Sequence, residues 1–343
     1  MKFFHAPPLG RARARILSRR PLAWAHAAAE SDRTPHPRAA SGVVWIGERL
    51  AVIQDDASFL ALVDAQTAEA TSIAMPVGPD GRRRFEPALG NKAAKLDLES
   101  AVAWADGATW HWLAFGSGST AARESVVHAC FEPDAEARVR VLPAPALYAA
   151  LRGAHAFSGD ALNVEGAALV GDRLRFFQRG NGAAGPDTDI ADATVDVDLA
   201  ALRGWLAGRA GEPALVAGSA RRYALGTLPG EPAVTGPVRL TFTDATVDGD
   251  GQVWFLACAE ASPNTYDDGL VVGAVVGRMD ARGAVVGLAR LVDDDGPVAL
   301  KAEGLVIDRH AAARLDRRRH GRPRARGRAL SVDLGELVDV GAG

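Results

Sequence analysis

A short motif recurs along this chain of 343 residues, and the recurrence constrains the fold more than any other feature. Each copy leads into an acidic residue and continues as a run of small and β-branched residues. Four segments align in this way: 96–102, 162–168, 241–247 and 301–306. A fifth segment, 38–44, shares the pattern but has serine at the acidic position. The chain is therefore expected to repeat one structural unit.

The spacing of the aligned residues indicates what that unit is. They are Ser41, Glu99, Glu165, Asp244 and Glu303, separated by 58, 66, 79 and 59 residues. A four-stranded propeller blade needs about 40–50 residues plus its inserted loops. We therefore predict an all-β chain, 1–343, that forms one β-propeller domain with five blades. A sixth blade remains an alternative within the 79-residue interval, and a sandwich or solenoid with chance similarity is the other alternative.

Further strands follow each aligned residue. Segments 49–54, 109–115, 173–178 and 252–257 are predicted second strands, and most are reached through turns rich in Gly or Asp. The 37 glycines and 19 prolines suit many short strands. A short helix is expected around 199–206.

The last repeat has too few strands for a full blade, because after Val306 only 329–334 is clearly strand-like. Such an open edge needs cover. The segment 11–37 precedes the first blade, and Arg15-Ile16-Leu17 within it could pair at that edge. Closure of the last blade by this N-terminal segment would remove the edge.

A propeller places equivalent residues of its innermost strands in a ring around the channel. The carboxylates of Glu99, Glu165, Asp244 and Glu303 are therefore expected around one channel mouth, with Ser41 at the fifth place. The second strands run antiparallel to the first, so the loops that follow them border the same mouth. These loops are polar, and they contribute four further candidate residues: Asp55, Ser117, Asn181 and Asn264.

Several carboxylates at one mouth repel each other unless something compensates their charge. A hard cation such as calcium could do so, because it takes six to eight oxygen ligands. Basic residues beside the same strands could also do so, through ion pairs made by Lys95, Arg179, Arg239 and Lys301. In a third interpretation the acids are structural and bind backbone amides of the neighbouring blade. All three interpretations stay open at this point.

Other motifs carry less weight. The loop 116–119, Gly-Ser-Gly-Ser, could cradle an anion, but without a following helix a tight turn is the simpler expectation. Cys130 and Cys258 both lie in apolar stretches and are expected to be buried thiols. The eight histidines show no zinc-binding spacing, and His111 is interpreted as an outward or interblade residue.

Charge and hydropathy limit the partners and the compartment. A net charge of −3 excludes attraction of the whole surface to nucleic acid, and no apolar run reaches the roughly 20 residues of a membrane span. Residues 18–22 resemble a twin-arginine export signal, but the apolar stretch after them contains His26 and is short. We expect a cytoplasmic monomer, with periplasmic export as the weaker alternative.

The segment 314–328 is strongly basic and lies where the last blade needs its second strand. It is interpreted as a basic arm, as an irregular loop, or as the product of an altered reading frame.

With these motifs in view, the chain resembles the bacterial phytase-like β-propellers, including the group with esterase-like activity of phytase. The resemblance covers about 38–334 and rests on Asn-Val-Glu-Gly at 163–166, Lys-Ala-Glu-Gly at 301–304, Asp-Asp at 55–56 and Ser-Pro-Asn at 262–264. It implies an acidic, calcium-loaded channel face that acts on phosphoesters or esters. The implied metal ligands are Asp55, Glu99, Glu165, Asp244 and Glu303.

The resemblance also implies contacts to a ligand. Lys95, Arg179 and Lys301 would meet a phosphorylated or other small polar ligand, and Ser117, Asn181 and Asn264 would add polar contacts. For catalysis the candidates are Glu165, Arg179 and Lys301. Ser41 departs from an all-acidic ring, so a propeller that binds a ligand or protein without catalysis remains the alternative.

Overall fold

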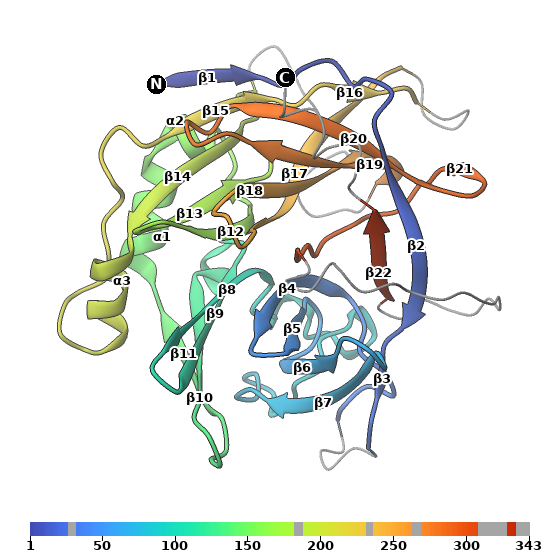
Figure 1. Ribbon diagram of the computed structural model, residues 1–343. Coiled ribbons are helices and arrows are strands. Elements are labelled where there is room, and N and C mark those ends of the chain that lie inside the picture. Colours follow the sequence, from blue (N-terminus) through green and yellow to red (C-terminus); the bar gives the residue numbers. More distant parts are fainter. Residues whose placement is uncertain (27–31, 182–187, 231–235, 263–268, 308–327, 334–343) are drawn as a thin grey trace.

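The computed structural model describes residues 1–26, 32–181, 188–230, 236–262, 269–307 and 328–333. Its regular structure is almost all antiparallel β-sheet, and its sheets stand around a common centre (Figure 1). The strands expected at 49–54 and 173–178 and the helix expected at 199–206 are present with those bounds. The all-β prediction is confirmed.

Four sheets contain four consecutive strands each, and the chain moves outward from the first strand of a sheet to its last. The strands of the first two sheets are β4 (Ala40–Ile46), β5 (Arg49–Gln54), β6 (Phe59–Asp64), β7 (Glu69–Ala74), β8 (Leu98–Asp106), β9 (Thr109–Gly116), β10 (Ser125–Phe131) and β11 (Arg138–Pro143). Those of the next two are β12 (Val164–Val170), β13 (Arg173–Gln178), β14 (Asp192–Asp198), β15 (Arg221–Ala224), β17 (Val238–Val247), β18 (Val253–Ala261), β19 (Leu270–Met279) and β20 (Val285–Asp293).

Smaller elements lie between these strands. They are the short strand β16 (Thr227–Leu228), the helices α1 (Pro145–Gly153), α2 (His155–Ser158) and α3 (Leu199–Leu206), and 3₁₀ helices at Pro87–Leu89, Lys92–Ala94 and Ala121–Arg123. A further short strand, β21 (Gly296–Pro297), follows β20. Among the described residues, none of the helices has the length and apolar character needed to cross a membrane.

The N-terminal residues add a strand to the outer edge of three different sheets. Strand β1 (Lys2–His5) pairs in parallel with β15, and β3 (Ala23–Trp24) pairs in parallel with β7. Between them, β2 (Arg13–Pro21) pairs with β20 and, antiparallel, with β22 (Arg328–Asp333). The twin-arginine-like residues therefore lie in a paired strand. The segment 11–37 is not confined to the last repeat, as the sequence suggested, because β3 binds the first sheet.

The innermost strands β4, β8, β12 and β17 are neighbours in that order, and the segment 300–307 lies between β17 and β4. On one side of this segment, Thr243 donates a hydrogen bond to the Ala302 carbonyl (2.6 Å). On the other side, the indole of Trp45 donates to the Ile307 carbonyl (3.0 Å). The fifth copy of the repeat therefore takes the place of an inner strand, although no strand is formed there.

A β-bulge at the same place in four inner strands defines which residues are equivalent. The pairing register shifts at Ser41 in β4, at Glu99 in β8, at Glu165 in β12 and at Thr243 in β17. The sequence alignment is therefore wrong by one residue in the fourth repeat, where Asp244 had been placed in the ring. The bulge leaves the extra residue unpaired on its own sheet, so its side chain is free to interact with neighbouring inner segments.

The residue after each bulge lies close to the next inner strand. A side chain at Gly42 would meet the Glu99 carbonyl, one at Gly166 would meet β17, and one at Gly304 would meet Val43. Glycine at these positions lets neighbouring inner strands approach each other. Farther out, aromatic rings fill the space between sheets; Phe242, for example, makes edge-to-face contacts with Phe177 and Phe255.

Candidate metal and ligand site at the channel mouth

Three glutamates occupy equivalent positions of the repeat and interact electrostatically. Burial raises the pKa of Glu99 well above its ordinary value, and the neighbouring carboxylates of Asp55, Glu165, Asp97 and Glu303 raise it further. Burial also raises the pKa of Glu303, with a contribution from Glu165. Three of the expected ring carboxylates, Glu99, Glu165 and Glu303, are thus brought together.

The other two equivalent positions carry hydroxyl groups. The Ser41 hydroxyl donates to the Leu98 carbonyl (2.6 Å), and Thr243 donates to Ala302 as described above. Both hydroxyls bind the backbone of the next inner segment, so these two positions connect neighbouring sheets.

Asp244, expected among the metal ligands, binds backbone amides. Its carboxylate accepts hydrogen bonds from the amides of Leu305 (2.7 Å) and Ala245 (2.8 Å), and it is 3% exposed. Burial raises its pKa well above the ordinary value, against the effect of these two amides. For Asp244 the structure therefore fits the structural interpretation, in which an acid links neighbouring inner strands.

An acidic group with a lysine at its centre forms one side of the mouth. The Lys95 ammonium contacts both Asp55 and Asp97, at 2.5 Å from Asp97 Oδ1. The other Asp97 oxygen accepts from Arg123 (2.7 Å) and from the Ser117 hydroxyl (2.5 Å). Asp97 is therefore held from three sides, and Ser117 is buried beneath it.

Glu99 completes this group. Ligand oxygens of Asp55, Asp97 and Glu99 lie within 4.8 Å of one another, close enough to surround a metal ion. Burial raises the pKa of Asp55 to about 7, although Lys95 lowers it. Within the described part of the chain the Glu99 carboxylate has no hydrogen bond and no ion pair. Its charge is the least compensated at the mouth.

A buried arginine forms the other side of the mouth. Arg179, at the end of β13, donates to Glu165 (3.2 Å), to Glu260 at the end of β18 (2.5 Å) and to the Thr241 hydroxyl (3.2 Å). Only 3% of its side chain is exposed. Burial tends to raise the pKa of Glu260, but Arg179 and Lys301 lower it more strongly, so the pKa lies below its ordinary value. Arg179 thus links three elements.

Lys301 and two asparagines surround this arginine. The Lys301 ammonium contacts Glu303 (2.7 Å) and lies 3.9 Å from Glu260. Asn163 donates to Glu165 (2.8 Å) and to Asn181 (3.3 Å). Ion pairs and hydrogen bonds therefore compensate this side of the mouth more fully than the side that carries Glu99.

Two further expectations have clear outcomes. Arg239 pairs with Asp192 (3.0 Å), away from the ring carboxylates. The amides of the 116–119 loop bind within the protein, since Ser117 donates to the Asp97 carbonyl and Gly118 to the Arg123 carbonyl. This arrangement favours the tight-turn interpretation. Asn264 and the basic segment 314–327 lie outside the described residues.

An open pocket of about 570 Å³ borders the Glu99 side of the mouth. Asp55 and Lys95 lie on its wall together with Arg38, Asp56 and Lys92. Arg38 forms ion pairs with Asp56 (2.8 Å) and Glu86 (2.7 Å). The pocket thus offers both cations and carboxylates beside the acidic group.

Residues 36–316 match the sequence pattern of DUF6929, a family of unknown function. The chain belongs to this family. No curated protein matches it significantly. Among solved structures it is similar to an α-L-arabinanase mutant from Cellvibrio cellulosa, with 10% identity, a TM-score of 0.35, and coverage of 75% of this chain and 79% of the other. It is also similar to AztD from Citrobacter koseri, with 10% identity, a TM-score of 0.23, and coverage of 74% and 59%.

Two central residues of this DUF6929 chain were not predicted as site residues. Asp97 stands two positions before Glu99 and two after Lys95, a spacing typical of side chains that share one side of an extended segment. The same spacing joins Asn163 to Glu165. Glu260 ends β18, so the rule that second strands return to the mouth could have identified it.

Proposed function

We propose that Asp55, Asp97 and Glu99 bind a divalent cation, with calcium as the first candidate, and that the cation helps hold a small phosphorylated or otherwise anionic ligand in the adjacent pocket. The observation that carries this proposal is the convergence of three carboxylates, one of which, Glu99, has no described partner. Hard cations prefer oxygen ligands of this kind.

The charge balance supports the same proposal. Among the described residues, the ion pairs and the group around Glu99 bring six carboxylates together with four cations at the mouth, an excess of two negative charges when all six carboxylates are ionised. The carboxylates are Asp55, Asp97, Glu99, Glu165, Glu260 and Glu303, and the cations are Lys95, Arg123, Arg179 and Lys301. Raised pKa values at Asp55, Glu99 and Glu303 indicate incomplete compensation. A divalent cation would supply the missing charge.

Lys95 occupies part of the proposed cation site. Its ammonium contacts the oxygens of Asp55 and Asp97 that a cation would use. Cation binding therefore has to draw Lys95 away from them. Because Lys95 also lies on the wall of the pocket, its ammonium would then be available to an anionic ligand there. Cation and ligand are in this way expected to bind cooperatively.

Hydrolysis of a phosphoester or ester is the reaction that such a site supports best. A bound cation would lower the pKa of a water ligand and neutralise charge that develops on the substrate. Lys301, whose side chain is 28% exposed, can contact a substrate oxygen directly. Arg179 is buried and engaged with Glu165 and Glu260, so it is a positioning residue for these acids.

A binding protein without catalytic activity is the second candidate. The observation that favours it is that Arg179 is held in ion pairs with Glu165 and Glu260. Lys301 is then the main cation on this side of the mouth that could neutralise negative charge on a substrate. A propeller that only binds a ligand at its mouth needs no additional cation to stabilise a transition state.

A panel of phosphoesters and carboxylic esters, assayed with and without calcium, separates the two candidates. Hydrolysis that requires calcium, and that falls at least about tenfold in Glu99→Gln but not in the surface control Glu132→Gln, supports the hydrolase. Ligand-induced thermal stabilisation without turnover supports the binding protein. If neither activity nor stabilisation responds to calcium, magnesium or manganese, the cation-dependent function is wrong.

We further propose that the fold is a five-bladed, closed propeller of the phytase-like type. The cyclic order of β4, β8, β12, β17 and the segment 300–307 supports five blades. The antiparallel pairing of β2 with β22 supports closure by the N-terminal strand. The acidic mouth beside Lys95 and Lys301 is the feature in common with phytase-like propellers.

A further inference from the structure

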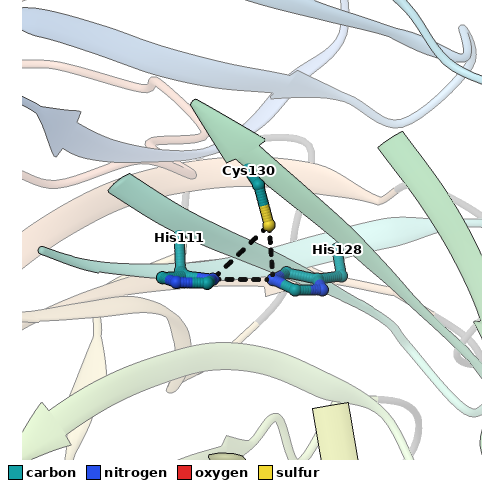
Figure 2. Close-up of side chains that lie close together, drawn as sticks. All are labelled: His111, His128 and Cys130. Atoms are coloured by element: carbon teal, nitrogen blue, oxygen red, sulfur yellow. Dashed lines mark hydrogen bonds between the residues drawn. The ribbon is translucent and has the colours of Figure 1, made fainter. Parts of the chain in front are cut away.

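A second group of metal-ligating side chains lies in the β8–β11 sheet, away from the channel mouth. It contains His111 of β9 and His128 and Cys130 of β10 (Figure 2). His111 and Cys130 are directly opposite each other across the two strands. His128 stands two residues before Cys130 on the same strand, so its side chain points to the same face. The pairing of the strands thus brings His111 to two side chains that follow it by 17 and 19 residues in the sequence.

The distances within this group are close to those of a tetrahedral metal site. His111 Nδ1 and His128 Nε2 are 3.0 Å apart, and Cys130 Sγ lies 3.5 and 3.4 Å from them. A tetrahedral zinc ion with ordinary bond lengths separates two nitrogens by about 3.3 Å and a nitrogen from a sulfur by about 3.6 Å. The three side chains would need to move apart by only a few tenths of an ångström.

We propose that His111, His128 and Cys130 bind a borderline-soft divalent transition-metal ion, with zinc as the first candidate. Two imidazoles and one thiolate are ligands that zinc prefers. Three protein ligands leave the fourth position to water or an external ligand. On binding, the Cys130 thiol releases its proton to solvent, and Sγ forms a bond to the metal.

The surroundings hold the group in place. The His111 ring stacks on Trp104 at 5.1 Å between centroids, and Trp104 is covered in turn by the guanidinium of Arg203 from α3. His128 is buried, whereas His111 and Cys130 are partly exposed. Burial lowers the pKa of His128 to about 4, and burial also lowers that of His111.

Arg140 is the residue that metal binding must displace. Its guanidinium lies 2.9 Å from His128 Nδ1 and can only donate, so Nδ1 accepts and Nε2 carries the proton that binds His111. A metal on Nε2 takes the place of that proton, and Nδ1 then has to become a donor. Arg140 would keep its hydrogen bond to the Leu206 carbonyl (3.1 Å). The site is consequently expected to bind metal more tightly when Arg140 no longer faces Nδ1.

This proposal is independent of the proposed function at the channel mouth, and a cobalt titration of the whole, reduced protein tests it. One equivalent of Co²⁺ should produce a thiolate-to-cobalt charge-transfer band that Zn²⁺ abolishes. The band should be lost in Cys130→Ser, and affinity should fall about tenfold or more in His128→Gln. His155→Gln, at an exposed histidine elsewhere, should leave the charge-transfer band and the affinity unchanged.

A second variant keeps the test decisive if the ligand variants fold poorly. Arg140→Gln removes the cation and supplies a side-chain oxygen that can accept from Nδ1, so Zn²⁺ affinity should rise about tenfold. The proposal is overturned if the wild-type protein gives no charge-transfer band, if the band persists in Cys130→Ser, or if Arg140→Gln binds Zn²⁺ no more tightly than the wild type.

Discussion

The guanidinium of Arg179 donates to the carboxylate of Glu165 across 3.2 Å, and both side chains are almost completely buried. The same arginine binds Glu260 from the neighbouring sheet. Its removal would take the nearest cation away from two buried acids. This relationship gives the first prediction.

Arg179→Met is expected to lower the free energy of unfolding by about 3–5 kcal/mol, because unpaired buried charges are costly. Urea denaturation at neutral pH measures the loss. Arg138→Met is the matched control, since Arg138 forms an exposed ion pair with Glu132 and should cost less than about 1 kcal/mol. Equal losses in the two variants would contradict a central role for Arg179.

Part of this arrangement follows from the sequence. The repeat predicted the inner strands and brought Glu99, Glu165 and Glu303 to one mouth, because each precedes a small residue in a matching phrase. It misplaced Asp244 by one residue, because a short motif does not show which of its residues forms the β-bulge; in β17 this residue is Thr243. It also missed the group containing His111 and Cys130, because only strand pairing makes these two residues neighbours.

Gly166 gives the second prediction. A side chain here would lie 3.2 Å from the Ala245 nitrogen and 3.1 Å from the Phe177 Cβ, closer than ordinary contacts. Gly166→Ala is therefore expected to cost about 1–3 kcal/mol through overpacking. Gly249→Ala, where no atom lies within 4 Å of the added carbon, should change stability by less than about 0.5 kcal/mol. Thermal and urea unfolding compare the two variants, and a tolerated Gly166→Ala would refute the close approach of β12 and β17.

Asp192 gives a pH-dependent prediction. Burial raises its pKa from 3.8 to about 6, against the lowering effects of Arg239 and of the Gly180 and Phe242 amides. The folded protein thus holds this proton more tightly than the unfolded chain. The stabilisation is complete below about pH 4 and is lost as the pH rises through about 6.

Asp192→Asn removes this dependence. The stability of the wild type relative to the variant should decrease by at most about 3 kcal/mol between pH 4 and pH 7. Urea denaturation of both proteins at each pH unit measures the difference. A difference that stays constant or increases with pH would mean that Asp192 is already ionised at pH 4.

The basic segment beginning at Asp316 gives a prediction about the gene. The family match ends at residue 316, where this basic segment begins. The residues Asp-Arg-Arg-Arg-His-Gly at 316–321 can be encoded by GAC CGA CGC CGA CAC GGC. Read from the second base, these codons give Thr-Asp-Ala-Asp-Thr. We therefore expect the nucleotide sequence to contain an Asp-rich, strand-like phrase in a shifted frame, with a compensating shift near Gly327. The hypothesis fails if neither alternative frame contains one.

The central claim is that Asp55, Asp97 and Glu99 bind a divalent cation, and calorimetric titration of the purified protein with Ca²⁺ tests it most directly. The wild type should bind one calcium ion at this site. Glu99→Gln should weaken that binding about tenfold or more, because the site loses a charged ligand. Glu132→Gln, which removes an exposed acid elsewhere, should bind as the wild type does. The claim is contradicted if the wild type binds no calcium, or if Glu99→Gln binds it with unchanged affinity.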